Sequence, residues 1–249
     1  MIIDSFDTKT EPVMSIKDFY GEKNNLIEIC LVIFSKETYN YILKKYDCEV
    51  IGVIKACNGE YPIYKFNFEG KILGFYLTMI GSTMASQFVI EANWITGASK
   101  FIMFGSSGSL NKEITFNKYV IPTEAYRDEG MSYHYAKASD YIEIKNHSTV
   151  KNILDELHLP NVEGKIWTTD AFLRETKGQM AKRKEEGCIA VEMEIAGVQS
   201  VCDFHNLDLY SFIVTGDILS EEKYEVEGLH NANHSLDKLF IALEIAKRL

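Results

Sequence analysis

The sequence predicts an α/β fold, a three-layer α/β/α domain in which helices cover both faces of a mixed, mostly parallel sheet. The first observation is that short apolar runs, rich in β-branched residues, alternate with helical patterns along the chain. The second is the length of 249 residues, which suits one large domain. The third is that no internal repeat, low-complexity tract or linker interrupts the sequence. We therefore expect residues 1–249 to form a single domain.

The first half of the chain predicts strands with two helices between them. Residues 26–34 are a continuous apolar run and predict a buried strand, and Ser35 can cap a helix over residues 36–46. Two alternating runs on either side of Glu69-Gly70 predict a hairpin, and Gly97 predicts the end of a helix. In chain order, the remaining elements are strands over 50–56, 62–68 and 71–79, a helix over 82–97, and strands over 100–104 and 119–126.

The second half predicts helices that alternate with further strands. Pro160 predicts the end of the helix before it, and residues 235–249 have the apolar stripe of an amphipathic helix. The elements are, in chain order, a helix over 148–157, a strand over 162–168, a helix over 177–186, a strand over 189–191, a helix over 195–204, a strand over 209–214 and a helix over 235–249.

Composition and charge restrict the partners of the protein. The net charge of −10 argues against a nucleic-acid partner, which would require a basic face. No apolar stretch approaches membrane-spanning length, and the N-terminus lacks the apolar run of a signal peptide. The five cysteines, an odd number, and the apolar neighbours of Cys30 and Cys188 indicate reduced thiols in a cytoplasmic protein. No Cys-x-x-Cys occurs, and the surroundings of the glutamate pair Glu192 and Glu194 supply no further oxygen ligands in sequence, so we expect neither a metal nor a cofactor.

Two glutamates flank a methionine directly after a short apolar strand, in residues 190–197, Ala-Val-Glu-Met-Glu-Ile-Ala-Gly. The carboxylates of Glu192 and Glu194 can accept hydrogen bonds from vicinal hydroxyls, and Met193 can lie against a sugar or a ring. The two carboxylates point the same way if the chain stays extended and diverge if a helix begins between them. The alternative is an acidic first turn of a helix, stabilised by the helix dipole.

A second polar segment, Gly105-Ser106-Ser107-Gly108, follows a predicted strand. Two glycines allow the backbone to approach an anion closely, and the amides and hydroxyls of the segment can donate hydrogen bonds to it. The alternative is a plain tight turn without a ligand. On either interpretation, the sequence predicts a turn at these four residues.

Five segments in order resemble the nucleoside phosphorylase superfamily, which holds hexameric purine nucleoside phosphorylases, uridine phosphorylases and methylthioadenosine nucleosidases. They are residues 104–110, 120–135, 167–175, 190–197 and Thr215-Gly216-Asp217. The segment with Arg127-Asp128-Glu129-Gly130 is most similar to the uridine phosphorylase branch. For Arg127 and Asp128 we expect the internal salt bridges of a polar turn. The resemblance implies that the sheet is twisted, with a small barrel-like closure.

The resemblance also implies the residues of a nucleoside site. These are Glu192, Met193 and Glu194 for ribose, Phe172, Ser107 and Gly108 for the base, and Gly105 and Ser106 for phosphate. Asp217 matches the catalytic aspartate of purine-cleaving members, where a carboxyl group can protonate N7 of the leaving base. A core position is the alternative for Phe172, and a helix cap for residues 220–223 is the alternative for Asp217.

The chain departs from the family at its charged anchors. Met103 occupies the position of a phosphate-binding arginine, and Val-Ile-Phe-Ser-Lys at residues 32–36 replaces a Pro-Gly-Asp-Pro loop with its nearby arginine. Lys36 is the remaining cation there, although a solvated surface lysine is its simpler interpretation. Thr176 and Gly178 replace the glutamine and arginine with which uridine phosphorylases read the pyrimidine.

The resemblance implies a nucleoside phosphorylase, which cleaves the N-glycosidic bond of a purine (or uridine) nucleoside with phosphate to give free base and ribose 1-phosphate. The missing arginines leave two alternatives open, a phosphate-independent nucleoside hydrolase and a non-catalytic nucleoside-binding protein. The expected partners are a small-molecule nucleoside, phosphate in the case of a phosphorylase, and further copies of the chain, because the family implies a homo-oligomer, either a dimer or a hexamer.

Overall fold

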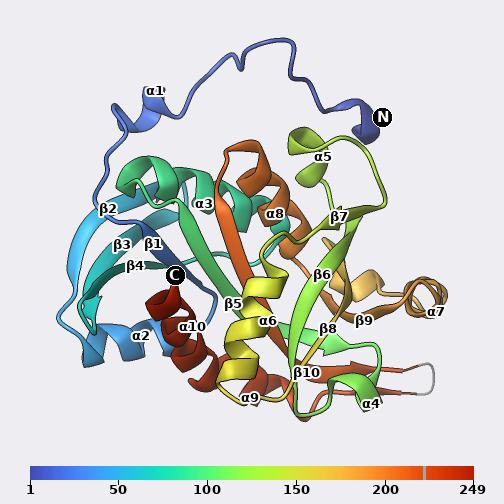
Figure 1. Ribbon diagram of the computed structural model, residues 1–249. Coiled ribbons are helices and arrows are strands. Elements are labelled where there is room, and N and C mark those ends of the chain that lie inside the picture. Colours follow the sequence, from blue (N-terminus) through green and yellow to red (C-terminus); the bar gives the residue numbers. More distant parts are fainter. Residues whose placement is uncertain (221–222) are drawn as a thin grey trace.

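A mixed sheet of 11 strands forms the middle layer of the computed structural model, which describes residues 1–220 and 223–249 (Figure 1). In chain order the strands are β1 (Ile29–Ile33), β2 (Glu49–Ala56), β3 (Gly59–Phe68), β4 (Lys71–Leu77), β5 (Lys100–Ser109), β6 (Tyr119–Asp128), β7 (Tyr141–Glu143), β8 (Asn161–Thr169), β9 (Cys188–Glu192), β10 (Asp208–Leu219) and β11 (Tyr224–Glu225). Their order across the sheet is β11-β10-β6-β8-β9-β5-β1-β4-β3-β2, and β7 pairs with β6.

Five of these strands close on themselves. Because β10 pairs with β5 as well as with β6, the path β5-β10-β6-β8-β9 returns to β5. The two longest pairings, β10 with β5 and β6 with β8, are parallel, whereas antiparallel pairs join β5 to β9 and β6 to β10. The mixed α/β sheet is therefore confirmed, as is its barrel-like closure. We call these five strands the closed ring.

Helices cover both faces of the sheet, and each face has its own apolar core (Figure 1). One core contains buried residues of α3 and α8, such as Phe88 and Val198, and the other contains Ile42, Leu154 and Leu243 of α2, α6 and α10. This packing gives the predicted three layers. The helices are α1 (Lys17–Tyr20), α2 (Lys36–Lys45), α3 (Ser82–Thr96), α4 (Lys112–Thr115), α5 (Ser132–Tyr135), α6 (His147–Glu156), α7 (Lys177–Glu185), α8 (Ile195–Phe204), α9 (Leu229–His234), α10 (Asp237–Arg248) and two 3-10 turns, η1 (Ile2–Asp4) and η2 (Phe172–Arg174).

The predicted helix start at Ser35 and helix end at Gly97 are confirmed. Ser35 caps α2, because its hydroxyl oxygen accepts a hydrogen bond from the Thr38 N–H. Gly97 ends α3 in the left-handed conformation at φ 83°, which glycine adopts without a steric penalty. The elements that the sequence did not predict are short, and α4, α5 and α9 each have six residues or fewer. Such segments are too short to show a helical period.

The predicted turn at residues 105–108 is wrong. β5 continues through these residues to Ser109, and its end pairs with β10 on one side and with β9 on the other. Both neighbours supply backbone hydrogen bonds, which hold the segment extended. A Cβ atom on Gly108 would lie 2.4 Å from Leu219 Cδ1, so this glycine permits the strands to approach closely. β10 likewise continues to Leu219, past its predicted end at residue 214, with an irregular register between Thr215 and Asp217.

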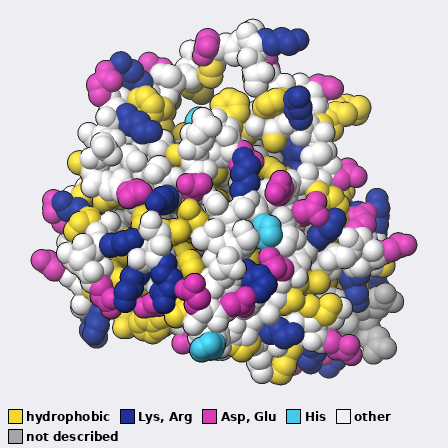
Figure 2. Space-filling model, viewed as in Figure 1, with side chains coloured by type: hydrophobic (Ala, Val, Ile, Leu, Met, Phe, Trp, Pro, Cys, Tyr) yellow, Lys and Arg dark blue, Asp and Glu magenta, His cyan; other side chains and the backbone are white. Residues whose placement is uncertain are grey.

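The surface and the thiols complete the description of the fold. Cys30, Cys188 and Cys202 are buried, and all five cysteines are free thiols. Acidic and basic side chains are interspersed over the face of the molecule shown in Figure 2. In the described ranges, no helix has both the length and the apolar character needed to span a membrane.

Candidate active site

One cavity of about 1010 Å³ collects every residue that the sequence motifs pointed to. It opens beside the ends of β5, β9 and β10, and α2, η2, α7, α9 and α10 contribute the rest of its wall. The sequence-predicted residues on its wall are Gly105, Ser106, Ser107, Gly108, Phe172, Glu192, Met193, Glu194 and Asp217. The closed ring therefore brings together segments that lie more than a hundred residues apart in the sequence, between Gly105 and Asp217.

The two glutamates have different partners, because Glu192 is the last residue of β9 and Glu194 directly precedes α8, which begins at Ile195. Glu192 is buried and accepts hydrogen bonds from the N–H groups of Glu194 and Ile195, at 2.7 and 2.8 Å, and from the Thr168 hydroxyl. Glu192 thus stabilises the start of α8. This agrees with the alternative prediction of a carboxylate at the start of a helix. Glu194 accepts a hydrogen bond from the Gly81 N–H at 2.7 Å. Of the two carboxylates, Glu194 has the fewer protein partners.

The surroundings of this pair change its acidity. Burial raises the pKa of both carboxyl groups, and the nearby charge of Glu194 raises the pKa of Glu192 further. The backbone N–H groups that donate to each carboxylate act in the opposite direction. Two buried carboxylates this close hold a proton more readily than exposed ones. Donors from a ligand, such as sugar hydroxyls, would favour the ionised form.

The glycine-rich end of β5 places two serine hydroxyls on the cavity wall. Ser106 donates a hydrogen bond to the side-chain oxygen of Asn233, which lies on α9. Ser107 is buried, and its hydroxyl has no hydrogen-bond partner among the described residues. A buried hydroxyl without a partner is costly, so a ligand with a polar edge would satisfy Ser107.

Another part of the cavity wall combines an exposed aromatic ring with acidic groups. Phe172 lies on η2 and is 58% exposed, so the alternative of a core position is wrong. Asp217 lies in the irregular part of β10, and Tyr224 forms a hydrogen bond with it. Burial, with the charge of Asp217 as the second cause, raises the pKa of Glu175 to about 7. The alternative prediction for Asp217 was a cap for a helix over residues 220–223. Residues 221 and 222 of that segment lie outside the described residues.

Several wall residues were missed by the sequence interpretation. Ser35, Asn233, His234 and Lys238 line the cavity beside Ser106, and Glu175 and Tyr224 line it beside Asp217. Lys238 had a signal, because a lysine on the apolar face of an amphipathic helix is unusual. The residues of α9 had none, since that helix spans only six residues.

Of the positions that depart from the family, Met103 and Lys36 lie outside this cavity, whereas Phe34 and Ser35 line it. Met103 is 3% exposed in the core under α3 and α8, and Lys36 is exposed at the start of α2, so neither lines the wall. The expected salt bridges of Arg127 and Asp128 are wrong. Arg127 donates instead to Ser132 and to backbone carbonyls such as that of Lys137, and Asp128 accepts from the Trp167 indole N–H at 3.0 Å.

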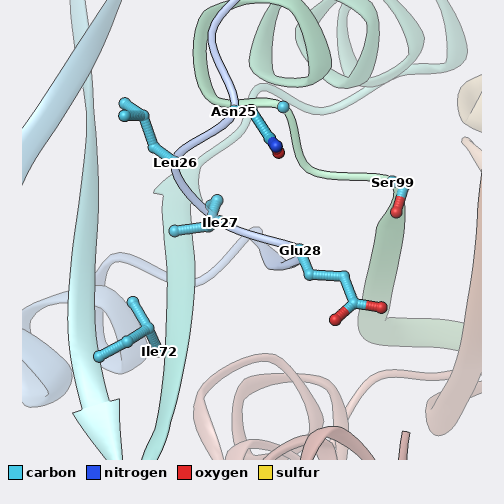
Figure 3. Close-up of a pocket in the computed structure, with 7 residues that line it drawn as sticks. Asn25, Leu26, Ile27, Glu28, Ile72 and Ser99 are labelled. Carbon is cyan, nitrogen blue, oxygen red and sulfur yellow. The ribbon is translucent and has the colours of Figure 1, made fainter.

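A second cavity, of about 350 Å³, is lined by few side chains that could take part in a reaction (Figure 3). Asn25, Leu26, Ile27, Glu28, Ile72, Gly97 and Ser99 line it. Its one titratable side chain, Glu28, forms an ion pair with Lys100 at 2.8 Å. In the described part of the chain, no group of three or more His, Cys, Asp or Glu side chains is placed to hold a metal ion. The large cavity is therefore the candidate active site.

A family model matches most of the chain. Residues 28–244 match the model described as the phosphorylase superfamily. The chain belongs to this superfamily. It is 27% identical over 203 residues to a DeoD-type purine nucleoside phosphorylase of Caldanaerobacter subterraneus subsp. tengcongensis, an alignment that covers 77% of this chain and 84% of that relative.

Solved structures of the superfamily share the fold. Futalosine hydrolase of Helicobacter pylori strain 26695 superimposes with a TM-score of 0.71 at 17% identity, over 90% of this chain and 99% of that one. The 5'-methylthioadenosine/S-adenosyl homocysteine nucleosidase of Campylobacter jejuni gives a TM-score of 0.71 at 20% identity, over 90% and 100% of the two chains. At this level of identity, the likeness establishes a common fold alone.

Proposed function

We propose that this protein cleaves the N-glycosidic bond of a purine nucleoside with phosphate, giving the free base and ribose 1-phosphate. The observation that supports it best is the convergence of Glu194, Phe172, Asp217 and Ser106 on one cavity. These four residues come from four separate segments, and the resemblance to the superfamily gives each a different role. A relative named purine nucleoside phosphorylase, which aligns with most of the chain, supports the same activity.

The proposed roles follow from the position of each group. Glu194 accepts hydrogen bonds from the ribose hydroxyls, with Met193 against the sugar, and Glu192 fixes the chain beside it. Phe172 stacks on the base, and Ser107 and Gly108 line the base pocket. Gly105 and Ser106 face the phosphate.

The proposed reaction exchanges one bond at C1′ for another. As the C1′–N9 bond breaks, its electron pair moves to the purine, and Asp217 donates a proton to N7 or hydrogen-bonds there. A phosphate oxygen then forms the bond to C1′. The transition state resembles an oxocarbenium ion, so the anionic nucleophile and the stabilised leaving base lower its free energy.

A purine is favoured over uridine by the residues near Phe172. Thr176 caps α7, where its hydroxyl accepts from the Gln179 N–H at 3.4 Å, and Gly178 has no side chain, so neither supplies a pyrimidine-reading group. Asp217 and Glu175 supply carboxyl groups on the same wall. Carboxyl groups can bind the N–H and ring nitrogen atoms of a purine edge.

Purified protein incubated with inosine, adenosine and uridine, with and without phosphate, tests this proposal. We expect purine release that requires phosphate, measured together with ribose 1-phosphate. Turnover at an equal rate without phosphate would reject the phosphorylase and leave a nucleosidase. A nucleoside that raises the melting temperature without being cleaved would instead indicate a binding protein.

A phosphate-independent hydrolase is the second candidate. Met103 and the replaced loop at residues 32–36 remove the usual phosphate anchors, and the solved structures that share this fold include proteins titled hydrolase and nucleosidase. In that case water attacks C1′ and the product is free ribose. The product analysis above separates the two reactions, because only one of them yields a sugar phosphate.

A further inference from the structure

The end of the cavity beside Ser106 is built from polar side chains on three helices. Ser35 caps α2, Asn233 and His234 end α9, and Lys238 lies in the first turn of α10. All four line the cavity together with Ser106 on β5. Asn233, His234 and Lys238 belong to none of the motifs that marked the family in the sequence, and Ser35 lies in the segment that replaces the Pro-Gly-Asp-Pro loop. This concentration of hydrogen-bond donors needs a ligand that accepts several hydrogen bonds at once.

Lys238 is the charged member of the group. Lys238 is only 3% exposed, and its ammonium group donates a hydrogen bond to the backbone carbonyl of Ala232. Within the described residues, no carboxylate forms an ion pair with it. Burial lowers the pKa of Lys238 to about 8, so the group still carries its charge at neutral pH. A buried cation without a carboxylate partner is costly, and an anion in the cavity would remove that cost.

His234 and Ser35 form a hydrogen-bonded pair that offers a ligand one further donor. The Ser35 hydroxyl and His234 Nδ1 are 3.0 Å apart, and Glu37 lies 3.9 Å from the same ring nitrogen. Because Nδ1 is occupied, Nε2 is the ring nitrogen that a ligand can use. The side chain of His234 is 31% exposed, so solvent and small ligands can reach it.

Ser106 and Asn233 connect this group to the sugar end of the cavity. Ser106 donates to the side-chain oxygen of Asn233, which leaves the amide NH2 of Asn233 as a further donor. Ser106 and Glu194 line the same cavity, so an anion held near Ser106 would share that space with a bound pentose.

We propose that Lys238, His234 and the amide of Asn233 form a subsite for inorganic phosphate beside Ser106, on helices other than the segments that carry the arginines of relatives. The inference rests on the proposed function, because it identifies the nucleophile of that reaction. The subsite also explains how phosphate binds without the arginines of relatives. Met103, at one of those arginine positions, and Lys36, the remaining nearby cation, do not line the cavity. A lysine from α10 supplies the positive charge in their place.

Titration of phosphate into the full-length protein by calorimetry tests the subsite without relying on turnover. Wild-type protein should bind phosphate with saturation. Lys238→Met should weaken binding at least about tenfold, because it removes a charge-assisted hydrogen bond. Lys36→Met is the matched control, since it removes a lysine outside the cavity, and it should leave the dissociation constant unchanged. Lys238→Met should fold, because an apolar side chain replaces a buried charge.

A second variant keeps the test decisive if Lys238→Met does not fold. His234→Ala changes a partly exposed side chain and should also weaken phosphate binding. The inference is overturned if wild-type protein does not bind phosphate, or if the cavity variants bind it as tightly as Lys36→Met. Phosphate binding that depends on Lys238, in a protein that cleaves no nucleoside, would reject the proposed function and uphold the subsite. Phosphate-dependent nucleoside cleavage by a protein whose Lys238→Met and His234→Ala variants bind phosphate as tightly as the wild type would uphold the proposed function and reject the subsite.

Discussion

Glu192 and Glu194 show how a single intervening residue separates two roles. Glu192 accepts hydrogen bonds from two N–H groups at the start of α8, whereas Glu194 accepts one from Gly81, at the edge of the cavity. A carboxylate whose oxygens are occupied by the backbone stabilises the fold. One with remaining acceptor capacity can bind a ligand. The two glutamates should therefore respond differently to substitution.

For Glu194, we expect a loss of substrate binding with little change in stability. Glu194→Gln keeps an oxygen for the Gly81 N–H but removes the charge that would hold ribose hydroxyls. This should lower kcat/KM for a nucleoside by about 10-fold or more. Steady-state kinetics measure the effect, with the exposed Glu185→Gln as the control. An unchanged kcat/KM would place the ribose site elsewhere.

For Glu192, we expect the larger loss of stability. Glu192→Ala leaves the N–H groups of Glu194 and Ile195 without their acceptor and the Thr168 hydroxyl without its partner. The free energy of unfolding should fall by about 1–3 kcal/mol. Urea denaturation followed by circular dichroism measures this. A variant as stable as the wild type would show that α8 does not need the cap.

The acidity of Glu175 predicts a pH dependence of stability. Its pKa rises from 4.5 to about 7 in the folded protein, chiefly through burial. Between these values the folded chain keeps a proton that the unfolded chain has released, so this group stabilises the fold at low pH and that contribution is lost as pH rises through about 7. Glu175→Gln should therefore reduce the fall in stability over this interval. Melting temperatures across the interval measure it, and an identical slope in both proteins would contradict the shift.

The residues of the candidate site were predictable only where a motif carried them. Glu194, Phe172 and Asp217 lie in segments that resemble the superfamily, and all three line the cavity. Lys238 and His234 lie in α10 and α9, where no motif marks them. Their proximity to Ser106 depends on how two helices pack against β5, which no local pattern encodes. The roles of all these residues stay predictions until variants are measured.

At the scale of elements, the long strands and helices were predictable and the strand ends were not. Apolar runs and caps identify β1, α2 and α3 because these signals are local. The extension of β5 through its glycines depends on β9 and β10, whose pairing is not visible in the sequence. Glycines and serines, which favour turns in isolation, were therefore misassigned.

The close approach of strands at Gly108 predicts sensitivity to a single methyl group. A Cβ there would lie 2.4 Å from Leu219 Cδ1 and 3.0 Å from Val191 Cγ1. Gly108→Ala should lower the free energy of unfolding by about 1–3 kcal/mol, because the strands of the closed ring must move apart. Chemical denaturation measures the change.

Gly178 provides the control for this substitution. No atom lies within 4 Å of a Cβ built at this position, which is inside α7. Gly178→Ala should leave stability unchanged or raise it by up to about 1 kcal/mol, because alanine favours the helix. Equal changes in the free energy of unfolding for the two substitutions would show that crowding around Gly108 does not limit stability.

At the scale of the whole molecule, the rim of the cavity exposes apolar side chains. Ile80, Phe172 and Leu173 line the cavity and are 70%, 58% and 83% exposed. Large exposed apolar side chains around a concave site are typical of surfaces that another protein covers. A second copy of the chain is the partner that the family resemblance implies.

We therefore expect the protein to form a homo-oligomer in solution. Light scattering coupled to size-exclusion chromatography should give a mass that is a multiple of the single chain. Leu173→Asp should shift the population towards the single chain, because a charge would have to be buried at the contact. Glu185→Gln is a suitable surface control. A monomeric wild type at all concentrations would contradict the expectation.

The closed ring has a consequence for how the activity of such a chain can change. Asp217 lies on β10 of this ring and Glu194 follows β9 directly, whereas the proposed phosphate donors Lys238 and His234 lie on α10 and α9, and Phe172 lies on η2. The binding of the attacking nucleophile and of the heterocycle thus depends in part on segments outside the closed ring. Mutation can alter either one separately, so two chains with the same closed ring can evolve different reactions.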